Sequence, residues 1–381
     1  MPAQVTLPGR AGPLVIPEPG WADAYPPPRR RRAFAAAHVA ATPEGDVDWE
    51  ATMRVREHLW AHGFGVAEAM DTAQRGMGLS WAQARELIAG SAARAAELGA
   101  GAALACGAGT DQLGGSADHG LRAIADAYAE QVAFVQDAGA QVILMASRAL
   151  AAAARGPRNY QEVYGELLKQ ADRPVILHWL GEAFDPALRG YWGSPGFDAA
   201  ADTVLELIER AGGQVDGVKL SVLDAGREVA LRRRLPAGVR LYTGDDFHYA
   251  ELIRGDAGGS HSDALLGAFA AITAPAAAAL AALDRGDVAG YDAAIGPTVP
   301  LSRLIFATPT YHYKVGVAFL AWLNGLQPHF AMLAGLHRRR PASHLIRVAE
   351  LAATARALTQ PGLAAERMGE WLARSVPKEA R

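Results

Sequence analysis

From residue 33 onward, short apolar runs alternate with longer stretches that have apolar residues at helical spacing. The short runs predict buried β-strands, and the longer stretches predict amphipathic helices. The expected strands cover residues 33–41, 63–70, 101–108, 140–147, 173–180, 215–222, 239–246 and 262–269. Most of the helical stretches between them end at glycine, a common helix stop signal. Eight strands alternating with helices over about 240 residues predict a (β/α)8 barrel.

After about residue 275 the pattern becomes helical throughout, as in APAAAALAALDRGD and YKVGVAFLAWLNGL. We therefore expect an extended lead-in over 1–32, the barrel over 33–275 and a C-terminal helical domain over 276–381. A doubly wound open sheet is the main alternative. Such sheets usually bind a nucleotide at a glycine-rich first turn, and no such turn follows residue 41.

Composition narrows the functional classes. The chain has 381 residues, of which 50% are hydrophobic and 20% charged, and its net charge is −3. This balance gives no sign of a nucleic-acid or anionic-membrane partner. A single cysteine, Cys106, excludes an intramolecular disulfide and fits a reducing compartment. No apolar run reaches the length of a membrane span, and the first 30 residues lack a signal-peptide pattern, so we expect a cytoplasmic protein.

One lysine stands out because the chain otherwise uses arginine for its surface cations. Only four lysines occur, and Lys219 lies between Val218 and Leu220 in the apolar run VDGVKLSVLD. Burial lowers the pKa of a lysine, so part of it is a neutral amine near pH 7, as imine formation requires. The alternative is a strand-end lysine whose ammonium group reaches water.

The barrel prediction also groups other polar residues, because the active sites of such barrels form at the carboxyl ends of the strands. The polar residues assigned to those ends are Asp71, Thr72, Thr110, Asp111, Ser147, Arg148, His178, Glu182, Lys219, Ser221, Asp245, Asp246, His248, His261 and Asp263. We expect them to converge around Lys219.

In order and spacing, several motifs resemble those of the dihydrodipicolinate synthase and N-acetylneuraminate lyase superfamily. They are ATPEGDVDWEATMRVREHLWAHG, LSWAQARELI, RPVILHW, VDGVKLS and YTGDD, and the likeness covers roughly residues 33 to 360. The resemblance implies a (β/α)8 barrel with a C-terminal helical domain, usually in a homo-oligomer. It also implies a class I aldolase or related lyase or dehydratase that acts on a small carbonyl compound and needs no cofactor. VDGVKLS is similar to the strand that carries the family's Schiff-base lysine, which assigns that role to Lys219.

The chain departs from the family pattern at three places. Where the family has GTTGE, which holds a keto-acid carboxylate, this sequence reads MDTAQRG, with only Thr72 in register. His178 replaces the tyrosine of the family's YNVP motif, and a second family tyrosine falls near Ser147. We infer that the carbonyl chemistry is kept and the substrate is changed, toward a sugar-derived ketone or keto acid.

These comparisons assign roles. Lys219 is the expected imine-forming nucleophile. His178 is the expected general acid/base, with a core histidine as the alternative. The expected substrate-binding residues are Thr72, Ser147, Arg148, Glu182, Ser221, Asp245 and His261. At least one of Asp245 and Asp246 is expected to cap the next helix.

Two other functions remain open at this point. Asp245, Asp246, His248, His261 and Asp263 are the residue types of a divalent-metal site, as in metal-dependent isomerases and class II aldolases. Alternating side-chain directions along a strand allow only two or three of them to converge. A non-catalytic sugar-binding barrel also fits the missing tyrosines but leaves Lys219 unexplained.

Overall fold

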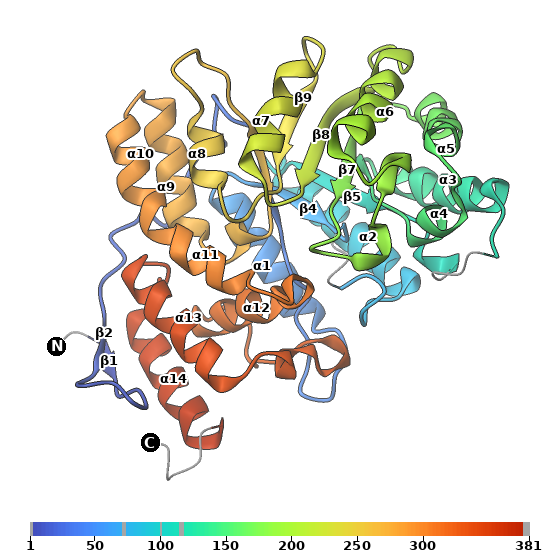
Figure 1. The fold of residues 1–381 in the computed structure, drawn as a ribbon. Coiled ribbons are helices and arrows are strands. Elements are labelled where there is room, and N and C mark those ends of the chain that lie inside the picture. Colours follow the sequence, from blue (N-terminus) through green and yellow to red (C-terminus); the bar gives the residue numbers. More distant parts are fainter. Residues whose placement is uncertain (1–2, 71–73, 100, 114–117, 376–381) are drawn as a thin grey trace. The chain divides into compact units, whose positions relative to one another are not determined.

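The computed structural model describes residues 3–70, 74–99, 101–113 and 118–375. Eight parallel strands form a closed barrel in which each pairs with its neighbours in chain order and β10 closes the sheet against β3. The strands are β3 (Ala33–Ala36), β4 (Gly65–Glu68), β5 (Leu104–Ala108), β6 (Gln141–Leu144), β7 (Val175–Leu180), β8 (Val215–Ser221), β9 (Arg240–Thr243) and β10 (Asp263–Leu266). The predicted (β/α)8 barrel is thus confirmed (Figure 1).

Contacts within the chain divide it into two compact units. The barrel unit comprises Arg31–Ala36 and Gly65–Leu266 and holds all eight barrel strands. The helical unit comprises Met1–Arg30, Ala37–Phe64 and Gly267–Arg381.

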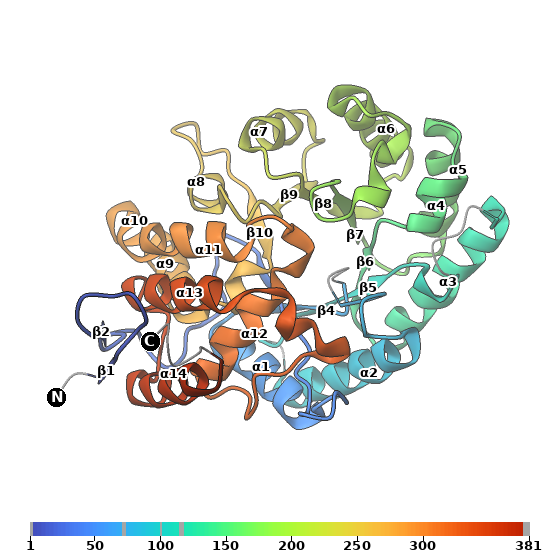
Figure 2. The ribbon, with the colours of Figure 1, turned by 60° about the horizontal axis from the view of Figure 1, so that its bottom comes forward.

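Helices α2 to α7 form an arc around the barrel strands (Figure 2). The helices of the barrel unit are α2 (Trp81–Leu98), α3 (Leu121–Asp137), α4 (Arg148–Ala153), α5 (Pro157–Gln170), α6 (Phe197–Arg210), α7 (Ala225–Arg234) and α8 (Tyr249–Arg254). Local chemistry fixes where they begin. Ser80 and Gln83 form a reciprocal capping box at the start of α2, and the Asp224 carboxylate accepts the Arg227 backbone N–H at the start of α7.

Small and large side chains alternate inside the barrel, so that neighbouring strands fill each other's space. Phe34, Ala67, Ile143, Ile176 and Leu265 belong to one buried cluster contributed by different strands. A Cβ atom on Gly65 would lie 2.5 Å from the Phe34 ring, so the absence of a side chain at this position leaves room for that ring. This filling makes the barrel interior a packed core.

Acidic and basic groups pair at the amino ends of the strands. Asp263, the first residue of β10, accepts the Arg32 backbone N–H at 2.6 Å and pairs with the Arg240 guanidinium at 3.0 Å. The Tyr242 hydroxyl donates to Asp216 at 2.6 Å. These bonds tie the starts of several strands together, and we call these five residues the amino-end network.

The helical unit consists of seven helices within the described residues and a short antiparallel hairpin. The helices are α1 (Trp49–Ala61), α9 (Thr273–Asp284), α10 (Val288–Ile295), α11 (Val299–Ile305), α12 (Lys314–Leu323), α13 (Ala342–Thr354) and α14 (Pro361–Ser375). The hairpin strands β1 (Ala3–Val5) and β2 (Leu14–Ile16) pack on α14 and α13, and Arg10 pairs with Glu350 at 3.0 Å. Helices cover most of the described chain after residue 273, and the lead-in that was expected to be extended contains this hairpin.

None of the described helices combines the length and apolar character that crossing a bilayer requires. Lys314 lies at the first position of α12, as a helix-start residue should, and it is buried.

Candidate active site

Strands β7 and β8 bring the two predicted catalytic residues side by side. His178 and Lys219 are direct partners in the parallel register, and both side chains are buried, with 2% and 7% exposed surface. His178 is two residues beyond Ile176, a member of the interior cluster, so the side chain of His178 also faces the barrel interior. The Lys219 Nζ donates to the Met70 sulfur at 3.7 Å, beyond the end of β4. Lys219 therefore projects into the barrel interior from the carboxyl half of β8.

His178 is held neutral by its surroundings. Burial, and then the nearby Lys219 charge, lower the pKa of His178 well below its ordinary value of 6.5. Its Nε2 lies 3.3 Å from the Ser221 hydroxyl, and its Nδ1 is buried with no hydrogen-bond partner among the described residues. The neutral imidazole keeps a nitrogen lone pair, so in the resting protein His178 can act as a base and not as an acid, and its lowered pKa makes it a weaker base than a free imidazole.

Ser221 and the turn after β9 complete this group. Ser221 is two residues beyond Lys219 on β8 and thus faces the same side. A Cβ atom on Gly244 would lie 2.1 Å from the Ser221 Oγ and 3.0 Å from the Lys219 Cε. Only glycine lets the backbone pass so close to both side chains.

Asp245 is engaged by its own turn. Its Oδ1 accepts the backbone N–H groups of Phe247 and His248 at 2.9 and 3.0 Å, and its Oδ2 lies 2.9 Å from the His248 Nδ1. Asp246 is also buried. The Asp245 contacts stabilise the turn before α8, whose N-cap is His248 with no side-chain capping bond, so Asp245 does not cap that helix as the sequence predicted for at least one of the two aspartates.

Ser147 and Arg148 follow β6 at the start of α4. The Ser147 hydroxyl caps α4 by accepting the Leu150 N–H and lies 2.5 Å from the Thr110 hydroxyl. The Arg148 guanidinium pairs with Asp185 at 2.6 Å.

Glu182 lies in the loop after β7, where it pairs with Arg189 at 2.7 Å on the surface. Both residues line a pocket of about 540 Å³, together with Trp179, Phe197 and Arg227. Trp179 stacks on Phe197, with ring centroids 5.0 Å apart. Charged groups beside a flat aromatic wall are chemically suited to a polyol, and the substrate-binding role of Glu182 stays a prediction.

His261 and Asp263 do not lie where the sequence placed them. The strand expected over 262–269 covers only Asp263–Leu266, so His261 precedes it and Asp263 begins it. Parallel strands place these two residues at the amino end of β10, opposite to the end where active sites form. Asp263 belongs to the amino-end network, and the His261 Nδ1 lies 3.0 Å from the Gly259 carbonyl. The expectation that they join the carboxyl-end group is therefore wrong.

The position of His261 and Asp263 at the amino end of β10 matters for the alternative in which the barrel holds a divalent metal ion. Within the described part of the chain, no three His, Cys, Asp or Glu side chains are close enough together to hold one metal ion. Two of the five candidates, His248 and Asp245, are joined by a hydrogen bond of 2.9 Å.

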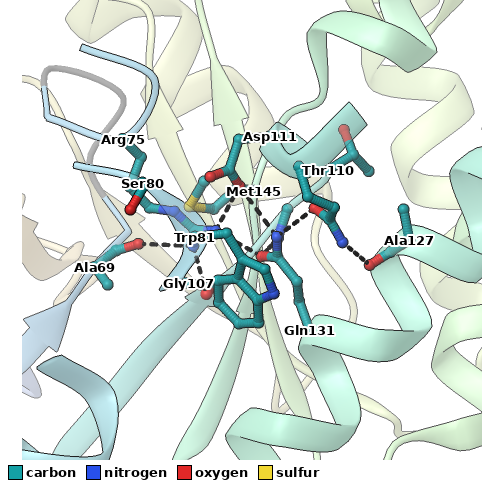
Figure 3. A network of polar contacts seen from close by, with 12 residues as sticks. Ala69, Arg75, Ser80, Trp81, Gly107, Thr110, Asp111, Ala127, Gln131 and Met145 are labelled. Atoms are coloured by element: carbon teal, nitrogen blue, oxygen red, sulfur yellow. Dashed lines mark hydrogen bonds and ion pairs between the residues drawn. The ribbon is translucent and has the colours of Figure 1, made fainter. Parts of the chain in front are cut away.

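Thr72 and Asp71 lie outside the described residues. The segment that follows them is anchored by Arg75, which sequence reasoning missed (Figure 3). Its guanidinium donates to the carbonyls of Ala69 and Gly107, to Gln131 and to Asp111, at 3.0, 2.9, 2.7 and 2.5 Å. The Trp81 ring lies 5.1 Å from it. The only signal in the sequence was an arginine soon after an apolar strand.

A second unforeseen feature is a buried tyrosine cluster on the helix side of β6. The hydroxyls of Tyr164 and Tyr191 lie 2.8 Å apart, and the Tyr191 hydroxyl accepts the Ser147 N–H at 3.0 Å. Tyr128 bonds to the Met145 carbonyl, and burial raises its pKa to about 12. These phenols stay protonated at neutral pH and support the turn that carries Ser147.

The closed (β/α)8 barrel of this chain resembles the fold of dihydrodipicolinate synthases. The chain belongs to the family described as protein of unknown function (DUF993), whose model matches residues 13–375. No curated protein matches the sequence.

Several solved structures share this fold. Dihydrodipicolinate synthase from Aquifex aeolicus is similar with a TM-score of 0.67 and 15% identity, over 87% of this chain and 99% of that one. A putative dihydrodipicolinate synthetase from Pseudomonas aeruginosa is similar with a TM-score of 0.65 and 16% identity, over 85% of this chain and 99% of that one. Dihydrodipicolinate synthase from Thermotoga maritima is similar with a TM-score of 0.62 and 15% identity, over 88% of this chain and 100% of that one. At these identities the likeness establishes the shared fold.

Proposed function

We propose that this protein is a Schiff-base lyase whose Lys219 forms an imine with a small carbonyl compound. The observation that supports this most is the pairing of buried Lys219 with a neutral His178 on adjacent strands inside the barrel. A buried amine beside a neutral base is the arrangement that carbonyl condensation requires. Neither residue belongs to the amino-end network that ties the strand starts together.

The proposed reaction conserves atoms and electrons at each step. The Lys219 amine adds to the substrate carbonyl to give a carbinolamine, and a proton from solvent lets its hydroxyl leave as water, so that a protonated imine remains. His178 accepts the proton of a β-hydroxyl, the C–C bond breaks, and its electron pair moves into the imine to give an enamine. His178 returns the proton to the enamine carbon, and water then releases the product from Lys219. In the equivalent dehydration, His178 takes the proton from the carbon next to the imine to give the enamine and delivers it to the departing β-hydroxyl, which leaves as water.

Two features bear on the substrate class: a motif that the sequence lacks, and a pocket beyond β7 whose described lining does not include Lys219. The sequence lacks the family's GTTGE motif, and the pocket beyond β7 has a Trp179–Phe197 wall with Glu182, Arg189 and Arg227 around it. These features favour a sugar-derived ketone or keto acid over pyruvate. A homo-oligomer and a cytoplasmic location remain predictions.

Reductive trapping tests the proposal. The purified protein is incubated with pyruvate, dihydroxyacetone, a ketose or a 2-keto-3-deoxy sugar acid, reduced with borohydride and mapped by peptide mass spectrometry. We expect a covalent adduct on Lys219 with at least one of the hydroxylated ketones. Lys169, exposed on α5, is the internal control and should stay unmodified. Turnover without any Lys219 adduct would refute the imine and favour metal-assisted chemistry, whereas binding without adduct or turnover would favour a sugar-binding barrel.

A further inference from the structure

The helical unit contains a pocket of about 760 Å³ that plays no part in the barrel chemistry. It is formed by α12, the 3₁₀ segment Leu333–Arg339, α13, α14 and the nearby chain. Its volume falls in the range of small-molecule sites. Four of its lining residues are arginines, Arg338, Arg340, Arg367 and Arg374, and its only lining carboxylate is Glu370. The pocket therefore carries an excess of positive charge.

Arg340 is the most buried of these arginines, with 8% exposed surface. Its terminal nitrogens donate to the carbonyls of Ala307, Thr308 and Pro309 at 2.5, 3.2 and 3.0 Å. Its Nε is buried without a hydrogen-bond partner, and no carboxylate in the described part of the chain forms an ion pair with it. Burying a cation with only carbonyl dipoles around it is costly, and an anion in the pocket would offset that cost.

Two further arginines keep donors available. Arg367 bonds through one terminal nitrogen to the carbonyls of Trp322 and Gln327, which leaves its Nε and second terminal nitrogen without a protein acceptor among the described residues. Arg338 is exposed at the rim and makes no hydrogen bond or ion pair within the described ranges. Guanidinium groups with unused N–H donors are suited to bidentate binding of phosphate or carboxylate.

The pocket also offers an apolar surface. Phe330 and Trp371 both line it and are only partly buried. His337 lies 5.7 Å from Phe330, ring to ring, and its Nδ1 accepts the Met332 N–H at 3.2 Å. With its Nδ1 accepting, the neutral imidazole carries its proton on Nε2, as one more donor. A ligand here meets both cationic donors and flat rings.

We propose that this pocket binds a small organic anion with at least two negative charges, an organic phosphate or a polycarboxylate. The four arginines provide the charge, and the partly buried rings accommodate the organic part. Inorganic phosphate alone would fill only a fraction of the volume and should bind more weakly.

Calorimetric titration of the full chain at low ionic strength tests this proposal. The probes are adenosine monophosphate and citrate, with adenosine and inorganic phosphate as controls. We expect at least one of the two organic anions to bind, adenosine not to bind, and added salt to weaken the binding. Binding of only one probe identifies the anion as a phosphate or a polycarboxylate. Failure of both organic anions to bind would overturn the proposal.

Neighbouring arginines provide a matched pair of variants. Arg338 lines the pocket, whereas the adjacent and equally exposed Arg339 does not. Arg338→Glu should weaken binding by about tenfold or more, and Arg339→Glu should change it by less than about twofold. Equal effects of the two substitutions would show non-specific attraction and contradict the site. Lys219→Ala should bind the anion like the wild type, which separates this pocket from the barrel chemistry.

Discussion

The two ends of the barrel strands hold their charged groups in different ways. At the amino ends, Asp263 and Asp216 meet guanidinium, backbone N–H and phenol donors at hydrogen-bond distances. In the carboxyl half, His178 has one buried ring nitrogen with no partner among the described residues, and it lies beside Lys219. Buried polar groups are normally satisfied, and this exception adjoins the lysine to which we assign the proposed chemistry.

Tyr242 lies at the boundary between these two ends. It is in register with Lys219 on one side and with Asp263 on the other. Its ring belongs to the interior cluster, while its hydroxyl points to Asp216 in the amino-end network. Burial, and then the Asp216 charge, raise its pKa, so it remains a hydrogen-bond donor. The apolar ring separates a paired, stabilising end from an end that keeps reactive groups.

The largest expected effect comes from removing the amine. Lys219→Ala should lower turnover by several orders of magnitude and abolish borohydride trapping, because no other group can form the imine. Stability should stay the same or rise, since a buried cation is lost. Activity and adduct formation are measured beside Lys169→Ala as the exposed-lysine control. Near wild-type turnover in Lys219→Ala would refute the mechanism.

Replacing His178 separates proton transfer from imine formation. His178→Phe should lower kcat by about 100-fold or more while trapping on Lys219 persists. The free energy of unfolding should change little, because the loss of the 3.3 Å contact between Nε2 and Ser221 is offset by removal of a buried Nδ1 that has no partner among the described residues. Wild-type kcat in this variant would assign His178 to packing and would remove the contrast between the two ends.

Much of this arrangement was visible in the sequence. The eight apolar runs marked the strands, and Lys219 stood out because it interrupts an apolar run in a chain with few lysines. The side-by-side placement of His178 and Lys219 depends on strand register, which a single sequence does not encode locally.

The errors and omissions have physical causes as well. The run 262–269 continues past the end of β10, because Ala268–Ala270 form a 3₁₀ turn with equally apolar residues. From the sequence, His261 and Asp263 were consequently assigned to the carboxyl end of the strand, whereas they lie at its amino end. The burial of Arg75 depends on acceptors that are distant in sequence, among them the carbonyl of Ala69 just after β4 and that of Gly107 in β5. The pocket of the helical unit brings Arg338 and Arg367 together from segments that are distant in the chain.

A change in the amino-end network should affect stability and not chemistry. Asp263→Ala leaves the Arg32 N–H and the Arg240 guanidinium without their acceptor, which should cost about 2 kcal/mol of unfolding free energy. Denaturant unfolding measures this cost, and Asp263→Asn, which keeps one acceptor oxygen, should lose less. Trapping on Lys219 should be unaffected in both variants. Loss of trapping in folded Asp263→Asn would show that the two ends are not independent.

The smallest expected effect is a dependence of stability on pH that comes from Glu228, a buried acid on the outer side of the sheet. Its carboxylate accepts the hydroxyls of Thr243 at 3.0 Å and Ser262 at 2.7 Å, next to the turn that carries Gly244. Burial raises its pKa from 4.5 to about 8.

Because the folded pKa of Glu228 is the higher one, the folded state holds a proton that the unfolded state releases above about pH 4.5. The stabilisation is fully present below that pH and is lost as the pH rises to about 8, by at most about 1.4 kcal/mol per pH unit. Glu228→Gln cannot titrate, so denaturant unfolding between pH 5 and pH 8 should show a flatter profile for the variant than for the wild type. Identical slopes would mean that Glu228 is ionised in the folded protein, and this acid would then resemble the paired carboxylates of the amino-end network.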